Sequence, residues 1–191
     1  MARVLVVFGT TDGHTARIAR HVANELRGLG HMVGVIDLRV DPLASLTGID
    51  AVIVAGSVRM GRFQRKLVHF VRDHADALER VPNAFLAVSL SAAQSSEAAR
   101  HEVAKTLARF TAKTHWTPDY AIPVAGALLY KRYGFLTRLV MRRISRMSGG
   151  DTDTSRDYEY TDWNALSDFA ARFDGALRAP ADGLSTAMGT A

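Results

Sequence analysis

Short apolar runs alternate along the chain with longer segments in which apolar residues recur every three or four positions. The runs are mostly rich in β-branched and aliphatic side chains and occupy residues 4–8, 31–38, 50–56, 84–91 and 120–125. Between the first two runs, Ile18, Val22 and Leu26 follow a helical period. Continuous apolar runs are typical of buried parallel strands, and the 3.6-residue period is typical of amphipathic helices. The pattern therefore predicts five strands that alternate with helices.

Three further helices are expected from the same spacing. They cover the apolar positions from Leu67 to Leu78, the segment from about 95 to 113, and a last segment that Thr161 or Asp162 caps. Residues 158–160 favour a short edge strand. Strands that alternate with helices of this length predict an α/β fold, with a parallel sheet and helices on both faces. Ligands of such sheets bind beyond the carboxyl ends of the strands, near a switch in strand order.

Composition favours a single domain. The 191 residues are 48% hydrophobic, which suffices for one core over residues 1–178, and residues 179–191 have the composition of a disordered tail. The absence of cysteine excludes disulfides, thiolate metal sites and cysteine catalysis. No apolar run approaches the roughly 20 residues that span a bilayer. We expect a protein that is cytoplasmic or peripheral to a membrane.

The net charge of +5 is concentrated in one segment. Residues 120–150 contain no Asp or Glu, yet they carry six basic residues. Within this basic insertion, at about 129–157, residues 135–147 form an amphipathic helical pattern in which Arg138, Arg142 and Arg146 share a face. One interpretation is contact with an anionic membrane surface, and the other is a helix packed on the body with a solvated arginine face.

The first strand runs into a loop rich in threonine and glycine. An anion at the start of the following helix meets unpaired backbone N–H groups. The loop lacks the Gly-Lys-Ser/Thr and G-x-G-x-x-G motifs, so it favours neither a triphosphate nor a dinucleotide. Hydroxyl groups can donate to a terminal phosphate, and Gly13 permits a positive φ. The residues concerned are Thr10, Thr11, Asp12, Gly13, His14 and Thr15. The Asp12 carboxylate must point away from a phosphate, and an ordinary turn capped by Asp12 stays an alternative.

The sequence contains no motif typical of a metal site or of a nucleophilic serine. The seven histidines lack H-E-x-x-H spacing, Asp151 and Asp153 lack the remainder of a calcium loop, and no G-x-S-x-G occurs. We therefore predict no metal site and no nucleophilic serine.

The threonine loop resembles the phosphate loop of flavodoxins, and further motifs resemble one family more closely. These motifs are Gly56-Ser57-Val58-Arg59-Met60-Gly61, the stretch 125–133, and Met147 to Thr154 continuing through Trp163. Together they are similar to the menaquinone-dependent protoporphyrinogen IX dehydrogenases, over nearly the whole chain. The resemblance implies a flavodoxin-like five-stranded sheet of order 2-1-3-4-5, with FMN at the switch between strands one and three.

The resemblance also implies roles for individual residues. The phosphate of FMN is expected on residues 10–15. The isoalloxazine ring of FMN is expected between two loops that contain no aromatic residue. These loops are Ser57, Val58, Arg59, Met60 and Gly61, with Ser89, Leu90, Ser91 and Ala92. The flavin itself performs the redox chemistry, so no catalytic side chain is predicted. Candidate contacts to the porphyrinogen are Arg59, Tyr130, Lys131, Arg132 and Tyr133.

The implied activity is oxidation of protoporphyrinogen IX, with electrons passed to menaquinone or another quinone during haem biosynthesis. The implied location is the cytoplasmic face of the inner membrane. Two alternatives stay open: a flavodoxin-type electron carrier, against which the sequence pI of about 9.9 argues, and an NAD(P)H-dependent FMN quinone reductase. No recognised module supports nucleic-acid binding. The sequence leaves open whether the chain forms a homo-oligomer.

Overall fold

The computed structural model describes residues 1–41, 46–129 and 155–178. The elements in chain order are β1 (Arg3–Gly9), α1 (His14–Gly28), β2 (Met32–Asp37), β3 (Ala51–Ser57), α2 (Arg65–Asp73), α3 (Ala75–Leu78), β4 (Asn83–Ser89), η1 (Ser91–Ala93), α4 (Glu97–Thr114), β5 (Tyr120–Ala125), β6 (Ala127–Leu128), β7 (Tyr158–Glu159) and α6 (Trp163–Arg178). All five strands expected from the apolar runs are present.

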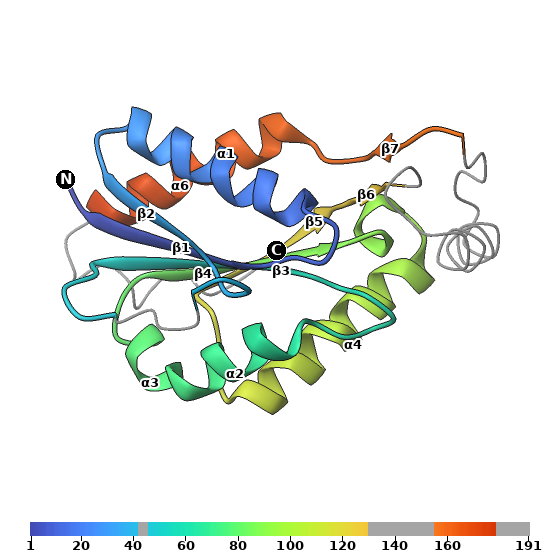
Figure 1. Ribbon diagram of the computed structural model, residues 1–191, viewed down its shortest axis with the longest axis horizontal. Coiled ribbons are helices and arrows are strands. Elements are labelled where there is room, and N and C mark those ends of the chain that lie inside the picture. The colour runs from blue at the N-terminus through green and yellow to red at the C-terminus, as the bar shows by residue number, and fades with distance from the viewer. Residues whose placement is uncertain (42–45, 130–154, 179–191) are drawn as a thin grey trace.

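Five parallel strands form one sheet in the order β2-β1-β3-β4-β5. Helices α1 and α6 cover one face, and α2, α3 and α4 cover the other (Figure 1). This is the flavodoxin-like α/β fold that the sequence predicts. The strand order reverses direction between β1 and β3, where Gly9 lies opposite Gly56 at the carboxyl ends of the two strands.

The central strands are buried on both faces, which explains their continuous apolar sequences. In β1, Val4, Val6 and Phe8 belong to the core beneath α1 and α6. The intervening Leu5 and Val7 belong to the core beneath α2, α3 and α4. Successive side chains of a strand point to opposite faces, so a strand between two helical layers has to be apolar at every position.

The predicted helix between Leu67 and Leu78 is wrong in one respect, because the structure has two helices there. Helix α2 ends before His74, whose φ of −121° lies outside the helical range. The His74 ring nitrogen Nδ1 lies 2.9 Å from the carbonyl oxygen of Phe70, and the two rings stack with centroids 4.6 Å apart. Local bonding by the side chain thus accompanies the break, which apolar periodicity alone does not reveal.

The expected edge strand at 158–160 also differs. Strand β7 pairs antiparallel with β6 in a separate two-stranded sheet, and it does not extend the main sheet. The core of the basic insertion, residues 130–154, and the tail at 179–191 lie outside the described residues. The last helix begins as predicted, because Asp162 Oδ1 accepts a hydrogen bond of 3.0 Å from the N–H of Ala165.

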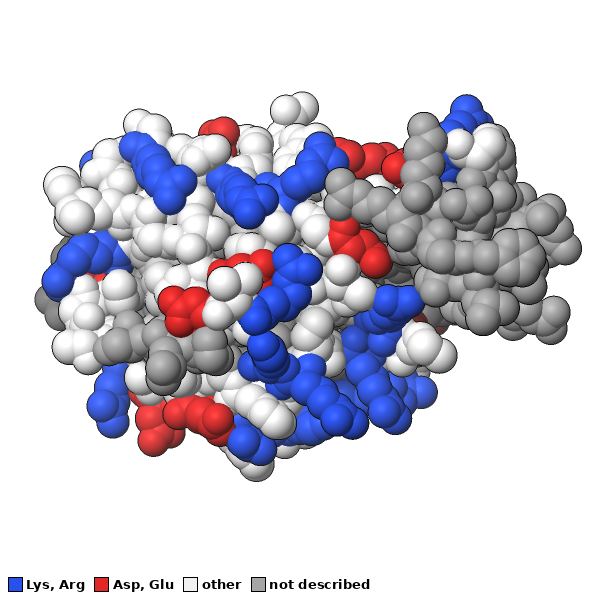
Figure 2. All heavy atoms as spheres, in the orientation of Figure 1, with Lys and Arg blue, Asp and Glu red and all other residues white. Residues whose placement is uncertain are grey.

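Lys and Arg outnumber Asp and Glu on the face of the molecule drawn in Figure 2. Within the described ranges, the helices are too short or too polar to cross a bilayer.

We predict that Gly56→Ala destabilises the protein. A Cβ atom at Gly56 would collide with Leu67 Cδ2 and lie 3.0 Å from Phe63 Cδ1, so both side chains would have to shift. Overpacking of this kind costs about 1 to 3 kcal/mol of the free energy of unfolding. Urea denaturation measures the loss, and Gly28→Ala is the matched control because a Cβ atom there meets nothing within 4 Å. Equal stability of the two variants would contradict the packing argument.

Candidate functional site

A cleft opens at the carboxyl edge of the sheet, where β1 and β3 end side by side. Its walls come from the loops after β1, β3 and β4, from one face of α4, and from the start of β6. The lining residues are Thr10, Thr11, Asp12, His14, Thr15, Ser57, Val58, Arg59, Met60, Gly61, Phe63, Ala87, Val88, Ser89, Leu90, Ser91, Glu102, Val103, Thr106, Leu107, Gly126 and Ala127. The three predicted loops therefore meet at one cleft, at the predicted switch point.

The loop after β1 leaves the first turn of α1 open. Gly13 holds the N-cap position with a φ of 88°, and no side chain of the described residues is seen to cap the helix. The first backbone N–H groups of α1 therefore lack intrahelical partners, and the helix dipole is positive there. The alternative of a turn capped by Asp12 is wrong, because Gly13 and not Asp12 occupies the cap. This end of the cleft suits an anion.

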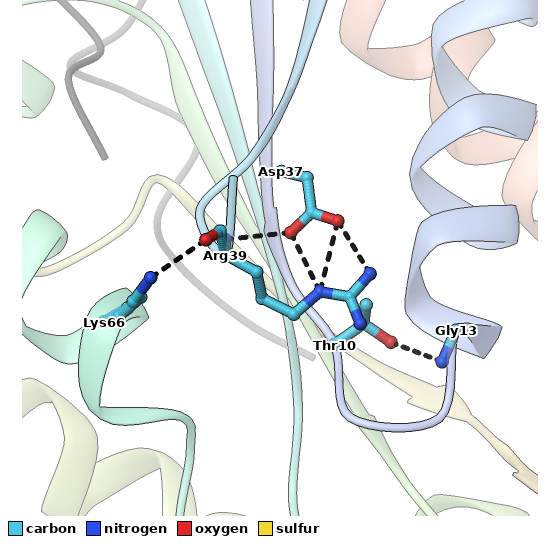
Figure 3. Close-up of polar contacts among 5 residues, drawn as sticks. All are labelled: Thr10, Gly13, Asp37, Arg39 and Lys66. Atoms are coloured by element: carbon cyan, nitrogen blue, oxygen red, sulfur yellow. Dashed lines mark hydrogen bonds and ion pairs between the residues drawn. The ribbon is translucent and has the colours of Figure 1, made fainter. Parts of the chain in front are cut away.

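Threonine hydroxyls complete this end of the cleft. Thr10 Oγ1 accepts a hydrogen bond of 2.9 Å from the N–H of Gly13 (Figure 3), so its own O–H hydrogen stays available to a ligand. Thr15 is only 1% exposed as a residue but lines the cleft, and its hydroxyl forms no hydrogen bond with the described residues. The hydroxyl can therefore donate to a phosphate oxygen.

The end of β2 lies near the same loop, and its Asp37 carboxylate pairs with the nearby Arg39 guanidinium. Asp37 accepts three hydrogen bonds of 2.8 to 3.2 Å from the Arg39 guanidinium, and Lys66 Nζ donates to the Arg39 carbonyl at 2.9 Å (Figure 3). The Arg39 side chain lowers the pKa of the Asp37 carboxyl. The last bond ties the β2 loop to the start of α2.

Gln64 joins the loops after β1 and β3. Its Nε2 donates to Ser57 Oγ at 2.6 Å and lies 3.2 Å from Thr11 Oγ1, while its Oε1 is buried without a partner. Sequence analysis missed this bridge, since a glutamine that precedes a helix carries no recognisable signal. The bond holds the two predicted loops at a fixed separation.

The loop after β3 closes in a tight turn. The N–H of Arg59 donates to the Arg62 carbonyl at 2.9 Å, and the N–H of Arg62 donates back at 3.1 Å. The two residues between them have positive φ, 51° for Met60 and 69° for Gly61, as in a type I′ turn. Met60 is 83% exposed at the tip. This turn forms the rim of the cleft.

The loop after β4 is fixed mainly by backbone bonds. Ser89 Oγ accepts from the N–H of Ala92 at 3.1 Å, and the Ser89 carbonyl accepts from the N–H of Gly126 at 3.0 Å. The N–H of Val58 donates to the carbonyl of Val88 at 2.7 Å. The loops after β3, β4 and β5 are therefore linked without side chains crossing the cleft.

His14 connects the first loop to the C-terminal part of the chain. The Thr161 hydroxyl donates to the Ala125 carbonyl at 2.7 Å, so its oxygen accepts from His14 Nε2, also 2.7 Å away. His14 Nδ1 is buried without a partner among the described residues. Burial lowers the pKa of the His14 imidazole, Glu159 partly opposes this effect, and Arg17 adds to it. His14 is thus held neutral.

One face of α4 forms a wall of the cleft that sequence analysis missed. Glu102 and Thr106, with Val103 and Leu107, are spaced one helical turn apart. The Glu102 side chain has no hydrogen-bond or ion-pair partner among the described residues. Its Oε1 would lie 3.7 Å from a Cβ atom placed on Gly61, so the carboxylate adjoins the rim turn.

Phe63 is a further residue that sequence analysis missed. It lines the cleft just beyond the loop expected to lack aromatic residues, and its ring packs against Phe85 and Phe110 with centroids 5.1 and 4.9 Å away. Within the described parts of the chain, no three His, Asp or Glu residues are grouped as a metal site would require.

The structure brings most of the predicted cofactor residues together. Thirteen of the fifteen line the cleft, and the other two, Gly13 and Ala92, form the turns that shape it. Of the predicted porphyrinogen contacts, only Arg59 falls within the described residues. The others, Tyr130, Lys131, Arg132 and Tyr133, lie outside them, as do the predicted membrane contacts Arg138, Arg142 and Arg146.

Solved structures place the fold in a known class. A flavodoxin of Streptococcus pneumoniae TIGR4 superposes with a TM-score of 0.55 at 17% identity, over 92% of this chain and 99% of that one. Oxidised Flavodoxin 1 from Bacillus cereus superposes with a TM-score of 0.52 at 15% identity, over 91% and 98%. The family model "Flavodoxin domain" matches residues 5–155. Fold and cleft therefore define a flavodoxin-like protein.

Curated relatives narrow the family. Protoporphyrinogen IX dehydrogenase (quinone) of Escherichia coli K12 is 34% identical over 168 residues, which cover 88% of this chain and 92% of the relative. The enzyme of the same name from Leishmania major is 31% identical over 172 residues, covering 90% and 74%. The chain belongs to this family of flavodoxin-domain oxidoreductases.

We predict that His14 makes the stability of the protein fall at mildly acidic pH. In the unfolded chain the imidazole binds a proton below its ordinary pKa, whereas the folded protein lowers that pKa. The contribution is therefore complete above the ordinary pKa and is lost as the pH falls below it. His14→Gln, which does not titrate, should lose less free energy of unfolding between pH 7.5 and 5.5 than the wild type does.

Urea denaturation at the two pH values measures this difference, with the exposed His69→Gln as the matched control. A variant at His14 that follows the wild-type pH dependence would show that the buried imidazole does not carry the effect.

Proposed function

We propose that the protein oxidises protoporphyrinogen IX with FMN as cofactor and passes the electrons to menaquinone, as a step of haem biosynthesis. The observation that carries the proposal is the cleft at the β1/β3 switch, with an uncapped helix N-terminus and threonine hydroxyls that can still donate a hydrogen bond at one end. It occurs in a chain 34% identical to a protoporphyrinogen IX dehydrogenase (quinone).

The residues at the first loop fit the phosphate of FMN. The first N–H groups of α1 and the hydroxyls of Thr10 and Thr15 would surround it, and no Lys or Arg occurs within residues 10–15. The isoalloxazine ring would lie between residues 57–61 and residues 89–92, beside the rim turn. Phe63, Val88 and Leu107 give this end of the cleft its apolar lining.

When bound, the flavin supplies a two-electron acceptor between the porphyrinogen and the quinone. Each two-electron oxidation of a porphyrinogen removes a hydride equivalent from a bridging carbon and one proton from the macrocycle, either from a pyrrole N–H or, in the tautomerisation that completes the porphyrin, from a bridging carbon. We assign that proton to the carboxylate of Glu102, which lines the cleft without a partner of its own among the described residues. Reduction of the quinone consumes two electrons and two protons, so Glu102 can return the proton in that half of the cycle.

The propionate groups of the substrate need cationic partners. Arg59 lines the cleft, and its planar guanidinium suits a carboxylate. We also propose Tyr130, Lys131, Arg132 and Tyr133 as substrate contacts, and Arg138, Arg142 and Arg146 as contacts to the cytoplasmic face of the inner membrane. These seven residues rest on the sequence resemblance and on the charge of the insertion.

We predict that Thr15→Val weakens FMN binding by roughly 10- to 100-fold. The variant keeps the shape of the side chain but loses a hydroxyl that donates to a charged oxygen, a bond that contributes about 1.5 to 3 kcal/mol. Quenching of flavin fluorescence during titration of the apoprotein measures the dissociation constant. Thr117→Val, at an exposed position before β5, is the matched control. An unchanged FMN affinity of Thr15→Val would contradict the binding of the phosphate by this loop.

Anaerobic half-reactions test the proposed activity. Addition of protoporphyrinogen to the flavin-loaded protein should bleach the flavin absorbance band, and a menaquinone analogue should restore it. Bleaching by NADPH without any response to protoporphyrinogen would instead favour the quinone reductase alternative.

In the same assay Glu102→Gln should slow bleaching at least about tenfold, because the amide cannot accept the proton. Glu97→Gln, in the first turn of the same helix, should behave as the wild type. Wild-type rates in Glu102→Gln at every pH would assign the proton elsewhere.

A further inference from the structure

Cationic side chains gather beside the rim of the cleft. Figure 2 shows Lys and Arg forming a band over the region of α2 and the loop that precedes it. Four basic residues of α2 and of the loop that precedes it are exposed: Arg59, Arg62, Arg65 and Lys66. We call these four residues, together with Met60, the basic rim.

The arginines of the basic rim have no carboxylate partner among the described residues, unlike five arginines elsewhere in the chain. Arg3, Arg17, Arg39, Arg72 and Arg178 each pair with a carboxylate at 2.6 to 3.1 Å. Within the ranges that the structure describes, the guanidinium groups of Arg59, Arg62 and Arg65 form no ion pair. The positive charge of the rim is therefore presented to the outside.

Met60 adds an apolar group in the middle of these charges. The type I′ turn projects it outward, and 83% of the residue is exposed. A φ of 51° is unusual for a residue with a long side chain, so the turn holds Met60 in a conformation that the chain does not favour by itself. An apolar tip flanked by cations is the composition of segments that lie in the interface of a bilayer.

We propose that the basic rim docks on a bilayer of anionic lipids, with Met60 entering the headgroup region and the mouth of the cleft facing the lipid. Met60 and Arg59 line the cleft, so docking by this turn necessarily brings the cleft to the surface. The role of this docking rests on the proposed function, because a quinone dissolved in the lipid would reach the cleft without crossing water. The rim is separate in sequence from the insertion at 129–157.

The chemistry favours lipid over an acidic soluble protein as the partner. Either partner would neutralise the arginines, because both present negative charge. Only the bilayer also offers an apolar layer directly beneath that charge, which the exposed Met60 side chain can enter. The rim thus matches both parts of an anionic lipid surface.

Sedimentation of the full-length, flavin-loaded protein with vesicles tests the docking surface. Vesicles of phosphatidylcholine with about 30% phosphatidylglycerol should bind the protein, and pure phosphatidylcholine vesicles should bind it far less. Arg62→Glu/Arg65→Glu should lower the partition coefficient at least about tenfold. The control Arg80→Glu/Lys113→Glu changes the net charge equally at the opposite edge of the sheet and should lower it less than about threefold.

Met60→Ser tests the apolar part of the surface. It should lower the binding that persists in about 0.5 M salt, where charges are screened. Met32→Ser, at another exposed methionine, 56% exposed at the start of β2, should not. Absence of binding to anionic vesicles, equal losses in the two charge-reversal variants, or binding to soluble polyglutamate but not to vesicles would each overturn the proposal.

Activity with a water-soluble quinone in the absence of vesicles separates docking from chemistry. Arg62→Glu/Arg65→Glu should keep the wild-type rate there, and its rate with a lipid-dissolved quinone should fall with its vesicle binding. Loss of the soluble-quinone rate in this variant would overturn the assignment of the rim to docking. Wild-type protein that binds vesicles through the rim but oxidises no porphyrinogen would leave the docking surface intact and refute the proposed function.

Discussion

The hydrogen bond from the N–H of Gly13 to Thr10 Oγ1, together with the positive φ of Gly13, turns the chain from the interior strand β1 directly into α1. This turn leaves the first N–H groups of the helix uncapped at the point where the strand order reverses. The other parts of the cleft are arranged around it. Gln64 holds the loop after β3 against it, and His14 connects it to Thr161 at the entrance of α6.

Most of the fold could be predicted from the sequence because its strands are buried on both sides. Such strands leave a continuous apolar run, and β1 and β3 are clear examples. The strand order came from the resemblance and not from periodicity, which carries no information on which strands are neighbours. The break at His74 escaped prediction because it accompanies a bond between a side chain and the backbone within an otherwise regular apolar pattern.

In the candidate site, too, the sequence revealed the features with a local pattern and missed those that depend on tertiary packing. The loops that follow β1, β3 and β4 were found because glycine, serine and threonine after a strand have a local conformational meaning. Glu102, Gln64 and Phe63 were not found, since each reaches the cleft only through tertiary packing. The α4 helix brings Glu102 against the rim turn from more than 40 residues further along the chain. No local pattern could have indicated that contact.

The uncapped helix and its threonines have a consequence for how the molecule responds to electrolytes. Among the described residues, a phosphate seated there would be held by buried N–H and O–H dipoles and by no mobile side-chain cation, and counter-ions in solution compete poorly with such fixed groups. Exposed arginines on the outside behave in the opposite way. A group bound through such a phosphate would therefore stay in the cleft at ionic strengths at which the protein itself would leave a charged surface.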